Sequence, residues 1–268
     1  MGEKFFSPEV VPGAGRWSER RPPWLDLCAM KLVLFDFDGT LTALDTTLPL
    51  GRHFAGATAG RAALARLGVA LVLARFRLMS NTGLKKIFAH QFLRGRSGPA
   101  VRELALAFWR SHLDSLAEPA VLDSLRAHVR NGDRVYLISA NFDCLLEPLV
   151  DLWSVAGVIG TRAEITGGVY TGRLAGAACH GNGKLDRALA QVGAADLQSA
   201  IAYGNHDDLP LLRRVQQGFL VRRAASAGLF SRLRRLRGIL AGKPAATGGP
   251  SACIITPLTP VLTSRPSV

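Results

Sequence analysis

The stretch KLVLFDFDGTLT at residues 31–42 places two carboxylates directly after an apolar run. The apolar residues 32–35 are typical of a buried parallel strand, and Gly39 then predicts a turn. Asp36 and Asp38 therefore end this strand, with both side chains on the same side. Open α/β sheets bind their ligands at this edge. A single aspartate here often caps a turn or helix, but the pair favours a functional site.

Composition limits the class of protein. The chain of 268 residues is 48% hydrophobic, so it can bury a sizeable core, either as one domain with a large insertion or as two modest domains. Its four cysteines form no CxxC pair, which indicates free thiols and a cytoplasmic protein. The formal charge of +13 favours anionic partners, namely phosphorylated small molecules, nucleic acid or an anionic lipid surface.

The two ends of the chain differ in composition from its middle. Residues 1–29 mix Pro, Gly and both signs of charge without a signal-peptide core, so we expect a disordered extension or a start upstream of the true one at Met30. Residues 241–268 predict a loose, disordered tail. No apolar stretch between them reaches the ~20 residues of a membrane span. The nearest, residues 67–79, is bracketed by arginines and indicates a helix buried in protein or lying at an interface.

Hydrophobic periodicity changes along the folded part. Residues 45–130 carry apolar side chains at helical spacing and predict a long helical insertion. Residues 165–174 predict a hairpin that turns on Gly167-Gly168. Further strands are expected, with helices between them, at residues 134–139, 156–160, 199–204 and 218–221.

Strands that alternate with helices indicate an α/β fold with a doubly wound parallel sheet. Its core comprises residues 30–44 and 131–240. The insertion after the first strand, residues 45–130, then forms a helical cap over the carboxyl ends of the strands. Such a cap can close over a substrate.

Polar side chains also follow the later strands. Ser139 ends the second strand, and Lys184 opens a helix after the hairpin. The fourth strand runs into Asn205, Asp207 and Asp208. Because parallel strands end at the same edge of a sheet, we expect these groups to converge with the first two aspartates. A set of acids, a hydroxyl and an ammonium suits phosphoryl transfer.

In this order and spacing the motifs resemble the haloacid-dehalogenase-like (HAD) superfamily. DFDGT at 36–40 is similar to its first motif, and the resemblance covers about residues 30–235. In detail it is similar to subfamily IB, the phosphoserine-phosphatase-like hydrolases with a cap after the first strand. Residues 167–184, GGVYTGRLAGAACHGNGK, also resemble the bacterial members that include phosphatidylglycerophosphatase C. The resemblance implies a HAD-like Rossmannoid core and a phosphoric monoester hydrolase.

The resemblance also implies a role for each residue. Asp36 is the nucleophile that forms an aspartyl-phosphate, and Asp38 protonates the leaving oxygen and then activates water. Ser139, Lys184 and Thr40 bind the substrate phosphate. Taken singly, Ser139 also fits a helix cap and Lys184 a solvated surface lysine. Mg²⁺ is the expected cofactor, because the site offers only hard oxygen ligands.

The fourth motif departs from the family pattern. Family members usually have Gly-Asp and a second acid three or four residues later, whereas here Asn205 follows the glycine and the spacing is shorter. We expect the metal at Asp36, Asp38, Asn205 and Asp208, with Asp207 as the alternative to Asp208. An asparagine carbonyl adds no negative charge, so metal affinity is expected to be weakened. His206 is interpreted as a structural loop residue.

The cap is strongly cationic, which favours an acidic substrate, although most of its cations are expected on a solvated helix face. Asp45 lies near the cap acid of phosphoserine phosphatases, but its neighbours are not similar enough to carry that role over. The cap cations are Arg52, Arg61, Arg66, Arg75, Arg77, Lys85, Lys86, Arg94 and Arg96.

The basic segments bear on two larger partners, a membrane and nucleic acid. Residues 229–240 form a basic amphipathic helix that either contacts an anionic membrane peripherally or packs its leucines on the sheet. No basic platform interleaved with aromatic residues occurs in the sequence, so nucleic acid is not an expected partner.

The sequence thus predicts a Mg²⁺-dependent phosphomonoester hydrolase that acts on a small phosphorylated metabolite or phospholipid head group. The alternative is a catalytically impaired HAD-like protein that binds an anionic partner. Asp38 argues against the metal-free dehalogenases of the superfamily, which lack it. A phosphate-binding P-loop fails because Ala178 and Leu185 replace its required Gly and Ser or Thr.

Overall fold

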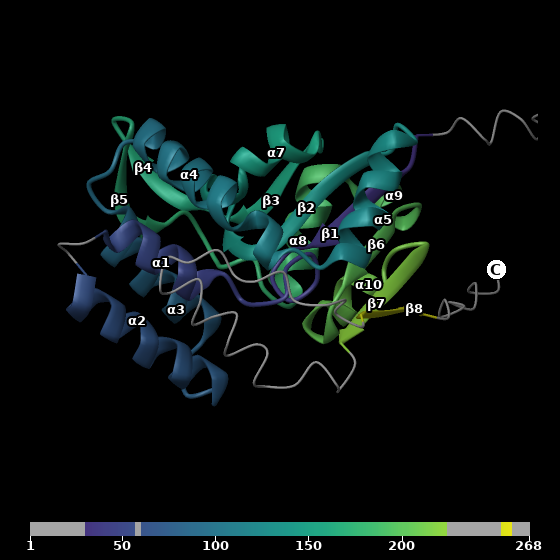
Figure 1. Ribbon diagram of the computed structural model, residues 1–268. Helices are drawn as coiled ribbons and strands as arrows, with labels where there is room; N and C mark the ends of the chain where they lie inside the picture. The colour runs from purple at the N-terminus through teal and green to yellow at the C-terminus, as the bar shows by residue number, and fades with distance from the viewer. Residues whose placement is uncertain (1–29, 57–59, 224–252, 259–268) are drawn as a thin grey trace, which may run out of the picture. The chain divides into compact units, whose positions relative to one another are not determined.

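A computed structural model describes residues 30–56, 60–223 and 253–258 of the chain. A six-stranded sheet forms its centre (Figure 1). The strands are β1 (Leu32–Asp36), β2 (Arg134–Phe142), β3 (Gly157–Thr161), β6 (Ile201–Gly204), β7 (Gln217–Arg223) and β8 (Cys253–Pro257), arranged in the order β3-β2-β1-β6-β7-β8. The first five run parallel to one another, which confirms the predicted α/β fold with a doubly wound sheet.

Both faces of β1 are buried, which explains its continuous apolar run. Val33 and Phe35 belong to the hydrophobic cluster that includes the cap and α5 (Pro119–Arg130). Leu32 and Leu34 face the other cluster, formed with α8 (Asn182–Val192), α9 (Ala194–Gln198) and α10 (Leu209–Leu212). Helices therefore cover both faces of the sheet, as the pattern predicts.

The strand order reverses at β1. The chain goes outward from β1 through β2 to β3, and then crosses back to β6 and β7 on the other side. Asp36 of β1 is paired with Ile138 of β2, and Phe35 is paired with Tyr203 of β6. The carboxyl end of β1 is therefore the topological switch point, where sheets of this kind bind ligands.

A helical cap stands between β1 and β2. It consists of α1 (Thr47–Ala55), α2 (Gly60–Arg75), α3 (Asn81–Phe88), the π-helix η2 (Ala89–Leu93) and α4 (Gly98–Leu116). Two hydrogen bonds close its base, because the Ala43 and Glu118 N–H groups donate to the carbonyls of Leu116 and Leu41. Beyond this closure α5 packs against β2. This helix, expected within the cap region 45–130, instead covers the sheet.

The predicted hairpin is present as β4 (Ala163–Thr166) and β5 (Val169–Leu174). Both turn glycines, Gly167 and Gly168, have positive φ, as this tight turn requires. The hairpin packs against η2 of the cap. Just after η2, the Arg96 carbonyl accepts the Tyr170 N–H and the Gly95 N–H donates to the Tyr170 carbonyl. The short helices α6 (Asp143–Leu146) and α7 (Pro148–Trp153) connect β2 to β3.

The expectation of a loose tail over residues 241–268 is wrong at residues 253–257. These residues form β8, which pairs antiparallel with β7 and covers its otherwise open edge. The β-branched run Ile254–Thr256 suits a strand, although the Pro-rich sequence around it hides the signal. Residues 241–252 and 259–268 of the tail, the basic helix expected at 229–240 and residues 1–29 lie outside the described residues. Within the ranges described, none of the helices has both the length and the apolar character needed to cross a membrane.

Candidate active site

Asp36 is held by three donors from three parts of the fold. Lys184 Nζ donates to its Oδ1 at 2.7 Å. The Thr40 hydroxyl donates to Oδ2 at 2.6 Å, and Asn205 Nδ2 donates to the same oxygen at 2.9 Å. The carboxylate lies at the end of β1 and is buried. Its orientation is therefore fixed before any ligand binds.

Lys184 is shared between two carboxylates. It lies in the first turn of α8 and is 4% exposed, and its Nζ also donates to Asp208 Oδ1 at 2.5 Å. Burial alone lowers the pKa of Lys184, but the charges of Asp36 and Asp208 together raise it above its ordinary value. Burial and the nearby Asp208 raise the pKa of Asp36 to about 7, against the opposing charge of Lys184. The alternative of a solvated surface lysine does not fit this position.

The turn after β6 brings Asp208 to this lysine. Asp208 Oδ2 accepts the Asn205 N–H at 2.9 Å, and Asn205 Oδ1 accepts the Asp207 N–H at 2.9 Å, so the two side chains cap the 3-10 helix η3 (His206–Asp208). Gly204 leaves room for the turn, because a Cβ there would lie 2.7 Å from Asp208 Cβ. Asp208 is buried, whereas Asp207 and His206 are exposed.

Asp38 connects the sheet to the cap. Its Oδ1 accepts the Thr46 N–H at 2.9 Å and the Thr46 hydroxyl at 2.7 Å, at the start of α1. Asn141 Nδ2 donates to the Thr46 hydroxyl at 3.1 Å and lies 3.4 Å from Asp38 Oδ2. Burial and the charge of Asp45 raise the pKa of Asp38 to about 6, while Lys85 opposes the shift. One carboxylate therefore both lines the site and anchors the first cap helix.

Lys85 is an exception among the cap cations, most of which are expected on a solvated helix face. It is 3% exposed, and its Nζ donates to the Thr47 hydroxyl at 3.2 Å, so it does not belong to the solvated face expected for the cap cations. Its neighbour Lys86 is exposed. The available signal is its position on α3 beside Leu84 and Phe88, which mark the buried side of that helix.

Ser139 and Thr40 were both expected to bind the substrate phosphate, and in the structure each side-chain oxygen already takes part in a hydrogen bond. Ser139 lies in an irregular part of β2, where its Oγ accepts the Asn141 N–H at 3.0 Å. Among the described residues, its hydroxyl has no hydrogen bond to Asp36 or Lys184. Thr40 is fully buried and donates to Asp36. Asn141 was missed as a site residue, although it follows Ser139 at the period of 2 that keeps both on one side of a strand.

The oxygen atoms at this site are ligands suited to a hard cation. Asn205 Nδ2 lies 2.9 Å from Asp36 Oδ2 and 3.2 Å from the Asp38 carbonyl oxygen, so two oxygens converge on one point that a hydrogen-bond donor now fills. If the Asn205 amide turned over, its oxygen would face this point, and the hydrogen bond from the Asp207 N–H to Asn205 Oδ1 would be lost. The described residues contain no cluster of three or more acidic, His or Cys side chains suited to a metal. A Mg²⁺ ion would therefore rely on main-chain, amide and water oxygens in addition to Asp36.

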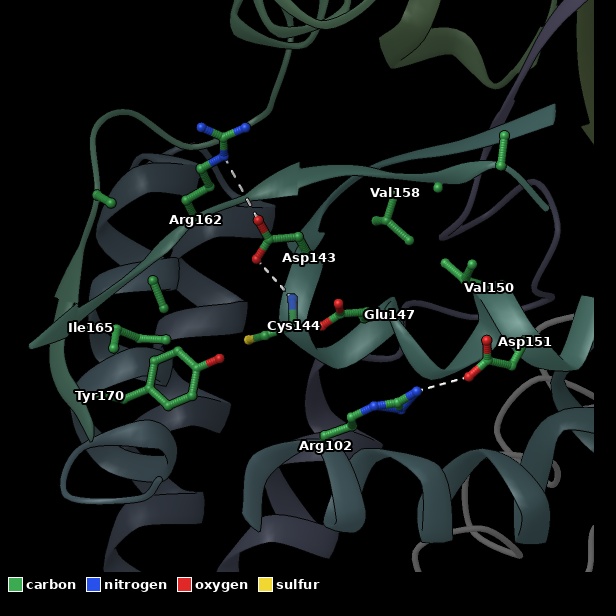
Figure 2. A pocket seen from close by; sticks show the side chains of 14 residues that line it. Arg102, Asp143, Cys144, Glu147, Val150, Asp151, Val158, Arg162, Ile165 and Tyr170 are labelled. Carbon is green, nitrogen blue, oxygen red and sulfur yellow. Dashed lines mark hydrogen bonds and ion pairs between the residues drawn. The ribbon is translucent and has the colours of Figure 1, made fainter. Parts of the chain in front are cut away.

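A cavity of about 560 Å³ lies away from these residues and is lined by α4, α6, α7, β3 and the β4–β5 hairpin (Figure 2). Figure 2 shows Arg162 and Arg102 at opposite ends of this cavity, each beside an aspartate. Arg102 is paired with Asp151 at 2.8 Å, and Arg162 lies 3.9 Å from Asp143. Because these charges compensate one another in pairs, we place the candidate active site at Asp36.

The fold and the site together define a capped hydrolase of the doubly wound α/β type. Residues 33–213 match the haloacid dehalogenase-like hydrolase family. A Mycobacterium tuberculosis protein named phosphoserine phosphatase SerB1 is 31% identical over 90% of this chain and 81% of its own length. Protein CicA of Caulobacter vibrioides is 31% identical over 65% of this chain and 78% of its own.

The fold is also found among solved structures. A Bordetella pertussis protein of unknown function superposes with a TM-score of 0.61 at 23% identity, over 68% of this chain and 86% of its own. The chain belongs to the haloacid dehalogenase-like hydrolase family. The cap after β1 and these relatives confirm the predicted resemblance to subfamily IB.

Lys184→Met should destabilise the protein by about 3–5 kcal/mol, because it leaves two buried carboxylates without their cation. The double variant Lys184→Met/Asp208→Asn should recover part of this loss, since one of the stranded charges is removed. Urea unfolding followed by circular dichroism measures both. Additive losses in the double variant would contradict a shared buried ion network.

Lys85→Met should lower kcat/KM for phosphomonoesters by about tenfold or more, because Asp38 loses a buried compensating cation and α3 loses its bond to Thr47. Lys86→Met is the matched control, since it removes the same charge from an exposed neighbour, and it should leave kcat/KM nearly unchanged. Steady-state kinetics compare kcat/KM of the two variants with that of the wild type. Equal effects would show that Lys85 acts only through the general positive charge of the cap.

Proposed function

We propose that this protein is a Mg²⁺-dependent phosphomonoesterase that works through an aspartyl-phosphate at Asp36. Its substrate is a small phosphorylated metabolite or a phospholipid head group. The observation that carries the proposal is the clamp on Asp36, in which Lys184 holds one carboxylate oxygen while Thr40 and Asn205 hold the other. A carboxylate fixed in this way at a switch point is positioned as a nucleophile.

The reaction needs two displacements at phosphorus. In the first, a carboxylate oxygen of Asp36 forms a bond to phosphorus, the ester P–O bond breaks, and the Asp38 carboxyl gives its proton to the leaving oxygen. In the second, Asp38 takes a proton from water, which attacks phosphorus and releases inorganic phosphate and the free Asp36 carboxylate. Lys184 stabilises negative charge on the phosphoryl group, and Ser139 is proposed to hydrogen-bond one of its oxygens.

The proposed Mg²⁺ ligands are the Asp36 carboxylate, the Asp38 carbonyl and the Asn205 amide oxygen. When bound, the ion supplies the positive charge that lets a carboxylate approach an anionic ester. Asp208 is a further proposed ligand, as the sequence predicts. Like those of Asp36, its carboxylate oxygens also accept hydrogen bonds, here from Lys184 and from the Asn205 N–H, so Asp208 also sets the position of Asn205.

The relatives support a small phosphorylated substrate, since one of them is named a phosphoserine phosphatase. Asp45 is exposed and accepts the Thr47 N–H at 2.7 Å, so it helps to begin α1. This local role does not by itself identify an ammonium-bearing substrate. A cytoplasmic location is part of the proposal, and the free thiols of Cys144, Cys179 and Cys253 support it.

The alternative, a catalytically impaired protein that binds an anionic partner, is favoured by one specific observation. The Asn205 amide nitrogen donates hydrogen bonds to the Asp36 carboxylate and to the Asp38 carbonyl, the two oxygens that would face a cation. The usual family aspartate would bring a second carboxylate there. The two functions therefore differ in whether this site binds Mg²⁺ at all.

Asp36→Asn should lower phosphate release by at least about a thousandfold, because an amide is a poor nucleophile. Chelation of Mg²⁺ by EDTA should abolish the wild-type activity, and added Mg²⁺ should restore it. Asp207→Asn, an equal charge change at an exposed position, is the control. The assay uses p-nitrophenyl phosphate, phosphoserine, sugar phosphates and phosphatidylglycerophosphate, with mass spectrometry of acid-quenched enzyme to detect the phosphoenzyme. Turnover by Asp36→Asn equal to wild type would exclude this mechanism.

Asn205→Asp should tighten Mg²⁺ binding by about tenfold, because a carboxylate replaces a neutral ligand and removes the N–H donor from Asp36. Titration calorimetry of both proteins measures the affinity, and the Mg²⁺-dependent rise in melting temperature should be larger for the variant. Binding by the variant but not by the wild type, together with an inactive wild type, would support the impaired protein. Equal affinities would place the ion away from Asn205.

A further inference from the structure

Helix α2 exposes an apolar stripe that its own packing does not need. The stripe consists of Ala62, Ala65, Val69, Val72 and Phe76, which recur at alternating intervals of three and four residues and therefore lie along one side of the helix. Val69, Val72 and Phe76 are 60%, 56% and 70% exposed. Phe76 continues the helical turn, because its N–H donates to the Val72 carbonyl.

A different side of α2 faces the cap. Ala63, Leu67 and Ala70 are buried, and α2 packs against α1 and α3 (Figure 1). Next to the stripe, an apolar groove of about 390 Å³ runs between α2 and α3, with Leu73, Met79 and Ile87 among its lining residues. Leu78, in the turn after the helix, is also exposed, at 75%. The apolar surface of α2 is thus continuous and open to solvent.

The charge around the stripe has a single sign. From residue 46 to residue 102 the sequence contains no aspartate or glutamate. Arg66, Arg75 and Lys86 are exposed on α2 and α3. The same stretch holds ten cations, namely Arg52, Arg61, Arg66, Arg75, Arg77, Lys85, Lys86, Arg94, Arg96 and Arg102.

This charge selects among possible occupants of the stripe. A second copy of the chain docked through α2 would bring arginines against arginines, which is unfavourable without acids to pair them. An anionic bilayer offers both an apolar layer for the stripe and phosphates for the arginines. With 16 residues, α2 is roughly 24 Å long, shorter than the ~30 Å hydrocarbon core. It fits in the plane of the interface.

We propose that α2 and the turn after it dock the protein on the surface of an anionic phospholipid bilayer. The apolar stripe enters the boundary between head groups and acyl chains, and Arg66, Arg75 and Arg77 lie at the lipid phosphates. The docking surface is separate from the Asp36 site, so the inference does not rest on the proposed catalytic chemistry.

The test is flotation of the full chain with vesicles of phosphatidylcholine alone or of phosphatidylcholine with phosphatidylglycerol. The protein should float with the anionic vesicles and dissociate as salt is added. Val69→Ser/Phe76→Ser should weaken binding by about tenfold or more. Leu152→Ser/Leu189→Ser, which removes exposed apolar side chains from α7 and α8, is the matched control and should bind as wild type does.

Charge is tested separately. Arg66→Gln and Arg75→Gln should each weaken binding by about fivefold, whereas Arg130→Gln and Arg213→Gln, exposed arginines elsewhere, should have little effect. Hydrolysis of p-nitrophenyl phosphate, or circular dichroism if the chain proves inactive, verifies that each variant is folded. Failure of membrane docking is therefore distinguishable from failure of the proposed activity.

Three results would overturn the proposal. The first is equal binding to neutral and anionic vesicles, or no binding to either. The stripe variant could bind as tightly as wild type, which would place the contact on another segment. Sedimentation velocity could show a dimer that the stripe variant abolishes while vesicles stay unbound, which would make a second copy the occupant.

Discussion

The buried ammonium of Lys184 between Asp36 and Asp208 is the interaction on which the site depends. Removing carboxylates from water costs several kcal/mol each, and only a cation held at close range offsets that cost. Three separate parts of the chain must therefore meet, namely the end of β1, the start of α8 and the turn after β6. The reversal of strand order at β1 brings them together. Gly204 then leaves the space in which Asp208 can fold back toward the lysine.

A second constraint joins the cap to the same centre. Asp38 accepts both hydrogen bonds that Thr46 offers at the start of α1, and Asn141 bridges the two residues from β2. Lys85 approaches from α3 and offsets part of the negative charge. The position of the cap and the orientation of Asp38 are consequently coupled. The proposed two-step reaction excludes water from its first step and admits it in the second, and such a coupling suits that requirement.

The sequence predicts those features that local pattern determines. Local pattern predicts the apolar run before Asp36, the strand spacing and the Gly167-Gly168 turn. The convergence of Asp36, Lys184 and Asp208 is predicted because parallel strands end at one edge of the sheet. Features that depend on tertiary pairing were missed or misplaced. Strand β8 needs the open edge of β7, and the buried position of Lys85 needs the cap to fold over Asp38. The sequence suggests Asn205 as an oxygen ligand, whereas its amide nitrogen is the group that meets Asp36.

The distribution of charge completes the physical account. The acids of the described core stand largely beside cations or helix starts, whereas the stretch from residue 46 to 102 has cations alone. The positive charge of residues 46–102 attracts anions from a distance, even though the centre of the site contains carboxylates that repel them at close range. Lys184 reduces this local repulsion, and the cap supplies the long-range attraction. Because residues 46–102 hold ten cations and no acids, this stretch carries most of the chain's formal charge of +13.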